Sequence, residues 1–169
     1  NLIYYRDMNY LKISIGVFLV LATSRFIPHP PNFTSLIALS FYVPLILGIK
    51  FLPVLILSFI VTDLFIGFHS LTLFTWGSII IIALISNSFK SKIFFRVPGA
   101  LIGACLFYII TNFGVWSLGS YGYTFEGLAS CYILAIPFFG NTLISTFLYS
   151  LLIEFLLIIK KNFFKPSKI

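Results

Sequence analysis

Charged residues are scarce in this sequence of 169 residues. They make up 9% of the chain, whereas about 25% is usual in soluble domains. Hydrophobic residues make up 60%, and the mean hydropathy is +1.09. This composition excludes a water-soluble domain and predicts an all-α membrane protein. A transmembrane helix takes about 20 apolar residues, so six spans fill the chain. No room is left for a nucleotide-binding domain, and any energy source must be a partner or an ion gradient.

The sequence also lacks the motifs of common enzymes and cofactor-binding proteins. It has no P-loop, no dinucleotide fingerprint and no Gly-x-Ser-x-Gly motif. The two cysteines, Cys105 and Cys131, lie in apolar surroundings and do not make a disulfide framework. We therefore predict no cofactor, and an enzyme is disfavoured.

Six apolar runs, separated by proline, glycine or polar segments, are candidates for transmembrane helices. They lie at residues 12–27, 35–47, 51–67, 71–86, 97–116 and 138–159. Several are short, so some of them are expected to be partly buried. We predict a single transmembrane domain over residues 1–169.

Basic residues gather on one side of these runs. With a cytoplasmic N-terminus, every Lys and Arg except Arg25 falls on the cytoplasmic side, and this excess predicts that both termini are inside. The same asymmetry explains the net charge of +7 without a nucleic-acid partner. The cytoplasmic residues are Arg6, Lys12, Lys50, Lys90, Lys92, Arg96, Lys160, Lys161, Lys165 and Lys168.

Polar and aromatic residues that apolar packing does not explain fall mostly on the outer side. This one-sidedness is the main indication of function in the sequence. The candidate ligand-binding residues are Arg25, His29, Asn32, Asp63, His69, Asn112, Trp116, Tyr121, Tyr123, Glu126 and Asn141.

Arg25 lies at the outer end of the first run, where a charge without a partner is unfavourable. The acidic residues on the same side are Asp63 and Glu126. Two interpretations stay open. Arg25 forms a structural ion pair or reaches the headgroups, or it clamps a carboxylate or phosphate of a ligand.

The segment after Arg25 contains Pro28, Pro30 and Pro31, which fix φ and remove three backbone donors. A stiff cap of this kind holds His29 and Asn32 in place, although a simple helix stop gives the same pattern. His29, Asp63 and His69 also offer two imidazoles and a carboxylate to a metal. Their spacing is not diagnostic, so a hydrogen-bonded pocket lining is favoured and no metal site is predicted.

The fifth run ends with Asn112 and Trp116, and Tyr121, Tyr123 and Glu126 follow in the next loop. An inward-facing Asn112 needs hydrogen-bond partners. The aromatic rings offer flat faces to a ring-bearing ligand, and an aromatic belt at the headgroups is the alternative.

Residues 128–139 form a short apolar stretch that contains Pro137, which predicts a re-entrant or interfacial segment. Asn141 then lies beside a broken helix, a common arrangement for ligand contacts in transporters. Glu154 lies deep in the last run. We expect it to reach toward Lys160 or Lys161, and a proton-linked or partner-facing acid is the alternative.

Four motifs carry a resemblance to a known family. They are Ala22-Thr-Ser-Arg-Phe-Ile-Pro-His-Pro-Pro-Asn-Phe-Thr34, Asp63 with Gly67 and His69, Thr111-Asn-Phe-Gly-Val-Trp116, and Gly127-Leu-x-x-Cys-Tyr132 running into Ala135-Ile-Pro-Phe-Phe-x-Asn-Thr142. On these motifs the chain resembles, over nearly its whole length, an uncharacterised family of small bacterial inner-membrane proteins.

That family in turn looks like the S components, the substrate-binding subunits of energy-coupling-factor transporters. S components have six helices and bind vitamins or their precursors in an outward pocket capped by loops. The resemblance implies an S-component-like bundle that takes up a small solute and works with a transmembrane coupling subunit and its ATPases. The chain departs from the small-xxx-small pattern that S components commonly carry on the first helix, because it has Ser14-Ile-Gly16-Val-Phe-Leu-Val20 there.

The leading hypothesis is therefore a solute-binding or uptake protein of the bacterial inner membrane, with a ring-containing or anionic solute in an outer pocket. One rival is a structural or accessory subunit of a larger membrane complex, in which the outer motifs form an interface with another chain. A second rival is a membrane-embedded enzyme that uses His29, Asp63 and His69.

Overall fold

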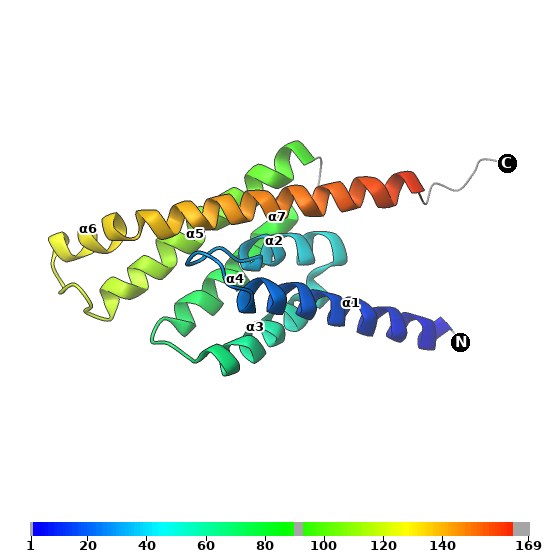
Figure 1. Ribbon diagram of the computed structural model, residues 1–169, viewed down its shortest axis with the longest axis horizontal. Helices are drawn as coiled ribbons and strands as arrows, with labels where there is room; N and C mark the ends of the chain where they lie inside the picture. Colours follow the sequence, from blue (N-terminus) through cyan, green and yellow to red (C-terminus); the bar gives the residue numbers. More distant parts are fainter. Residues whose placement is uncertain (1, 90–92, 164–169) are drawn as a thin grey trace.

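The computed structural model describes the backbone of residues 2–89 and 93–163 and the side chains of residues 9–89 and 93–161. These residues form seven α-helices and two short 3-10 turns, and no strand occurs among them (Figure 1). The elements are α1 (Leu2–Phe26), α2 (Leu36–Leu47), η1 (Ile49–Phe51), α3 (Leu52–Ile66), α4 (Thr72–Ser86), η2 (Asn87–Phe89), α5 (Ile93–Ser117), α6 (Phe125–Leu134) and α7 (Ile136–Phe163).

Four helical segments are long and apolar enough to cross a membrane. They are Ile49–Ile66, Thr72–Phe89, Ile93–Ser117 and Ile136–Lys161. The all-helical prediction is confirmed, and so is the presence of membrane-type helices. The number of six spans and their orientation stay predictions. Arg6, Lys90, Lys92, Lys165 and Lys168, which entered the orientation prediction, lie outside the described side chains.

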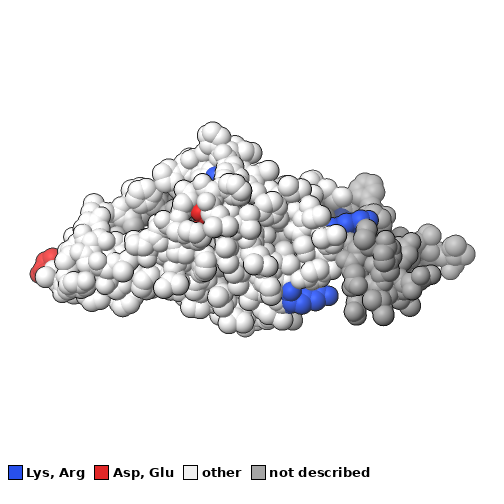
Figure 2. All heavy atoms as spheres, turned by 90° about the horizontal axis from the view of Figure 1, so that it is seen from below, with Lys and Arg blue, Asp and Glu red and all other residues white. Residues whose placement is uncertain are grey.

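The surface of the bundle is apolar, and part of its interior is polar. Leu73 is 78% exposed and Phe94 is 77% exposed, while Ser35, Thr62 and other hydroxyl residues are buried. Figure 2 shows one face of the molecule, on which uncharged residues form most of the surface. Large apolar patches are rare on soluble monomers, whereas hydroxyl residues between helices are usual in membrane bundles. This distribution agrees with a lipid-facing exterior.

Helix α2 lies in the middle of the bundle. Its residues from Leu36 to Leu45 are all buried, and it packs against α4, α5 and α7. With 12 residues it is about 18 Å long, which is shorter than the roughly 30 Å hydrocarbon core of a bilayer. The second predicted run is therefore a central, buried helix.

Three helix starts differ from the predicted runs, and the first of them is α1, which begins at Leu2 instead of residue 12. Helix α5 begins at Ile93, so Arg96 lies inside the helix instead of in the preceding loop. Helix α7 begins at Ile136 with Pro137 in its first turn, where the missing N–H removes no helical hydrogen bond. Pro137 thus starts the last helix and does not interrupt it, and the apolar stretch before it forms the separate helix α6.

Helix α5 packs closely on its neighbours at its glycines. A Cβ atom at Gly99 would lie 2.6 Å from Cζ of Phe41, and one at Gly103 would lie 3.1 Å from Cγ2 of Ile82. The start of α1 and the end of α7 lie at the same end of the molecule, and α6 lies at the other (Figure 1). We call this second end the outer end.

Candidate functional site

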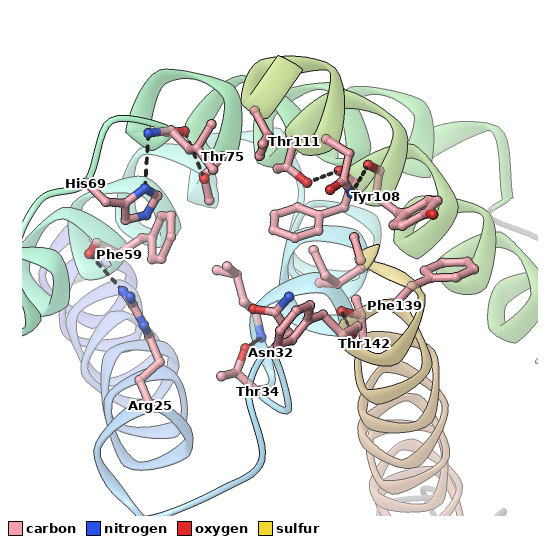
Figure 3. A pocket seen from close by; sticks show the side chains of 18 of the residues that line it. Arg25, Asn32, Thr34, Phe59, His69, Thr75, Tyr108, Thr111, Phe139 and Thr142 are labelled. Carbon is pink, nitrogen blue, oxygen red and sulfur yellow. Dashed lines mark hydrogen bonds between the residues drawn. The ribbon is translucent and has the colours of Figure 1, made fainter. Parts of the chain in front are cut away.

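A pocket of about 390 Å³ opens near the outer end of the bundle. Figure 3 shows Arg25 and Phe59 on one side of it and Tyr108, Phe139 and Thr142 on the other. The first group comes from α1 and α3, and the second comes from α5 and α7. The remaining lining residues are His29, Asn32, Thr34, Leu36, Ile37, Ile66, His69, Leu71, Thr75, Phe107, Thr111, Asn112, Val115, Ala135 and Phe138.

Five of the eleven residues that the sequence indicated line this pocket: Arg25, His29, Asn32, His69 and Asn112. They come from α1, the loop after it, the loop before α4 and the outer half of α5. The structure therefore brings together residues that are far apart in the sequence. None of the described lining residues is Asp or Glu.

Arg25 is held by a neighbouring carboxylate. Its Nη2 lies 2.7 Å from Oδ1 of Asp63, and its Nη1 donates to the hydroxyl of Thr62. The guanidinium carbon lies 4.4 Å from the centre of the Phe59 ring. Asp63 also accepts a hydrogen bond of 3.1 Å from Nε1 of Trp76. The ion-pair interpretation of Arg25 is confirmed, with Asp63 and not Glu126 as the partner.

The proline-rich loop is held at its base and in its middle. The hydroxyls of Ser24 and Ser35 lie 2.7 Å apart across its base, and Nδ2 of Asn141 donates to the carbonyl of Pro31 over 3.0 Å. Asn32 has a φ of 62°, a conformation that asparagine tolerates better than most residues. Asn141 therefore fixes the loop over the pocket instead of lining the pocket.

The two histidines make local contacts with the backbone. Nδ1 of His29 lies 2.7 Å from the carbonyl of Pro30, and Nδ1 of His69 accepts from the N–H of Leu71. The second nitrogen of His69 then carries the proton and is left for a ligand. Within the described residues, no three His, Cys, Asp or Glu side chains come together as a metal site would need.

One face of α5 lines the pocket. Tyr108, Asn112 and Val115 follow at helical spacing, and Nδ2 of Asn112 donates to the carbonyl of Tyr108. The Tyr108 ring stacks on Phe139 with a centroid distance of 4.4 Å. Tyr108 and Phe139 were not among the residues predicted from the sequence, although Tyr108 precedes Asn112 by one helical turn.

Four threonines were also missed: Thr34, Thr75, Thr111 and Thr142. The hydroxyls of the last three donate to carbonyls four residues earlier. These bonds leave a lone pair on each hydroxyl for a ligand donor. The sequence feature that could have identified these threonines is a polar residue near the outer end of an apolar run.

The aromatic residues of the outer loop do not line the pocket. Trp116 packs edge-on against Tyr123, and its Nε1 donates to the carbonyl of Thr124. Tyr121 and Tyr123 are exposed. The two tyrosine rings do not reach this pocket, because the loop folds onto α6. It packs so closely there that a Cβ at Gly127 would collide with the carbonyl oxygen of Tyr121.

Glu126 is exposed in the first turn of α6, away from the pocket. Hydrogen bonds from its own backbone N–H and from the Thr124 side chain lower the pKa of this carboxyl. It therefore carries a negative charge at the outer end.

Glu154 differs from the prediction. Its Oε2 lies 2.6 Å from Nη2 of Arg96, and the side chain is buried. The expectation that it reaches toward Lys160 or Lys161 is wrong, because Glu154 faces α5 inside the bundle, whereas both lysines follow it on α7 toward the end that carries the termini.

The fold and the site together define an all-helical bundle with membrane-type helices and a polar and aromatic pocket near one end. The chain belongs to DUF6580, a family of unknown function, which matches residues 7–165. No curated protein and no solved structure matches it.

Proposed function

We propose that this chain is a membrane-embedded solute-binding protein that captures a small, ring-bearing solute from the outer side. The observation that carries the proposal is the pocket of about 390 Å³. Small-molecule sites in proteins measure about 300–1,000 Å³ and combine apolar walls with a few polar groups. This pocket combines aromatic rings, hydroxyls, amides and an imidazole.

The charges around the pocket favour a neutral solute. Asp63 neutralises Arg25 at 2.7 Å, and no described lining residue carries a carboxylate. The pocket therefore presents neither a free cation for an anionic solute nor an anion for a cationic one. Hydroxyl and amide groups match the donors and acceptors on a heterocycle of vitamin size.

The proposed function includes transport of the bound solute into the cell. The bundle would lie in the bacterial inner membrane with six spans and both termini inside, as in the S components that the sequence resembles. The common end of α1 and α7 (Figure 1) supports two termini on one side. A transmembrane coupling subunit with ATPases would supply the energy.

Native mass spectrometry of the protein extracted from its own membrane in mild detergent tests this function. We expect a bound small molecule at one copy per chain. Thr111→Val removes a hydroxyl from the pocket and should weaken retention of this adduct. Thr23→Val is the matched control, because Thr23 makes the same hydrogen bond to a carbonyl four residues earlier but lies outside the pocket.

Two results would contradict the proposal. An adduct that both variants retain equally would place the solute elsewhere. A protein without any adduct but with another chain bound would favour the structural-subunit hypothesis. Arg25 is a poorer choice for this test, since its removal also leaves the buried carboxylate of Asp63 unpaired.

A further inference from the structure

Three hydroxyl groups in the outer pocket have already given their hydrogen to the backbone. They belong to Thr75, Thr111 and Thr142, which line the pocket. Each donates to the carbonyl four residues earlier, over 3.1, 2.8 and 2.9 Å respectively. A hydroxyl has one hydrogen and two lone pairs. Within the pocket, these three side chains therefore act as hydrogen-bond acceptors.

Asn112 adds an acceptor of a different kind. Its Nδ2 donates to the carbonyl of Tyr108 over 2.8 Å. Because a carbonyl oxygen only accepts, this contact fixes which end of the amide is the nitrogen. The amide oxygen Oδ1 and the second N–H of Nδ2 are left. Asn112 lines the pocket and is 9% exposed, and a buried acceptor needs a partner from protein, water or ligand.

We call Thr75, Thr111, Asn112 and Thr142 the acceptor group. They lie on α4, α5 and α7. Together they offer three hydroxyl oxygens and one amide oxygen, but only one N–H. Three of the four, all except Thr111, are buried. A solute that has no hydrogens to donate would displace their water and leave these oxygens unpaired, which is unfavourable.

The groups that can donate to a ligand lie elsewhere around the cavity. Nδ1 of His69 accepts from the N–H of Leu71, so the proton of the neutral ring is on Nε2. The Arg25 guanidinium also carries only donors. Figure 3 shows Arg25 and His69 on one side of the cavity and Tyr108 and Thr142 on the other. Donors are therefore found near α1 and the loop before α4, and acceptors extend from α4 to α7.

We propose that the pocket selects an uncharged ring that bears several N–H or O–H groups, from which the acceptor group accepts hydrogen bonds. The inference rests on the solute-binding function proposed above, and it names the class of solute. Amino-substituted and hydroxyl-substituted rings belong to this class. Carboxylates are excluded from the acceptor group, because an ionised carboxylate has no hydrogen to donate.

Two probes of similar shape test the proposal. One is melamine, a triazine ring with three amino groups, and the other is the triazine in which methyl groups replace all three. Both are uncharged at neutral pH, and only melamine has N–H groups. Equilibrium dialysis against the protein in detergent, with empty micelles as the blank, measures both dissociation constants. We expect melamine to bind at least about tenfold more tightly, since a site built for donors rejects an analogue that lacks them.

Thr111→Val tests the role of the acceptor group, because valine keeps the shape of threonine and removes the oxygen. It should weaken melamine binding by about threefold to tenfold, the usual contribution of one hydrogen bond. Binding of the methyl analogue should stay the same or become tighter, whereas a damaged fold would weaken both probes. Thr23→Val is the matched control and should change neither, because Thr23 makes the same helical hydrogen bond outside the pocket.

Two results in the wild type would overturn the inference, and they differ in what they leave standing. Equal binding of both probes, or tighter binding of the methyl analogue, would show that the pocket does not select donors, while a solute-binding function would stand. Binding of neither probe would contradict the ring-binding function as well. The wild-type comparison gives this decision even if Thr111→Val does not fold.

Discussion

Asp63 is an acidic residue beside the pocket whose side chain is only 2% exposed. Oδ1 of Asp63 lies 2.7 Å from Nη2 of Arg25, and Oδ2 accepts a hydrogen bond from Nε1 of Trp76. Removal of one partner from a buried ion pair costs far more than removal of both, since the remaining charge is stranded. The pair therefore fixes α1 to α3 and sets the position of the pocket wall.

Arg25→Met should lower the free energy of unfolding by about 3–5 kcal/mol, because it leaves Asp63 buried without a counter-charge. The double variant with Asp63→Leu should regain most of this loss. Thermal unfolding in detergent measures both. Lys12→Met, at an exposed position of the same helix, is the control and should have little effect. Additive losses in the double variant would mean that the two side chains do not act as a pair.

The pairing of Arg25 was partly predictable from the sequence, because an arginine at the outer end of an apolar run needs an acidic partner. Two acidic residues, Asp63 and Glu126, were available on that side. The roles of Thr75, Thr111 and Thr142 were not predictable, because a hydroxyl that bonds to its own helix is tolerated on every face. Arg96 and Glu154 are 58 residues apart, and their pairing depends on the packing of α5 on α7.

At the scale of elements, glycines mark the places where helices pack closely on one another, and prolines and glycines mark the places where helices begin and end. Prolines and glycines between apolar runs gave the approximate bounds of α2, α3 and α4. The start of α5 was missed, because a polar segment was interpreted as a loop, although Arg96 is accommodated inside the helix by Glu154.

Gly99→Ala should destabilise the bundle. The added methyl group would lie 2.6 Å from Phe41 and 2.7 Å from Phe89, and such overpacking typically costs about 1–3 kcal/mol. Gly77→Ala is the matched control, since no atom lies within 4 Å of its Cβ position and alanine favours a helix. Melting temperatures in detergent distinguish the two. A fall of equal size in both variants would contradict the packing argument.

At the scale of the whole molecule, two ion pairs among the described side chains each join two helices. Arg25–Asp63 joins α1 to α3, and Arg96–Glu154 joins α5 to α7. The pocket lies between these two helix pairs, with walls from both (Figure 3). A movement of one pair relative to the other would change the pocket without breaking either ion pair, which suits a protein that binds and releases a solute.

The general location of the site was predictable from the sequence, because polar residues gathered on one side of the apolar runs. Its lining was only partly predictable. Trp116, Tyr121 and Tyr123 lie near the same end, but the fold of a loop is not fixed by the spacing of its residues, and these rings pack against each other or are exposed instead of entering the pocket.

Filling the pocket is the most direct test of the central claim, that this cavity holds a solute. Thr111→Phe places a ring in the cavity, and Thr23→Phe makes the same change at an exposed position of α1. In native mass spectra we expect the solute adduct on the wild type and on Thr23→Phe, and its loss from folded Thr111→Phe. Retention of the adduct by folded Thr111→Phe would contradict the account.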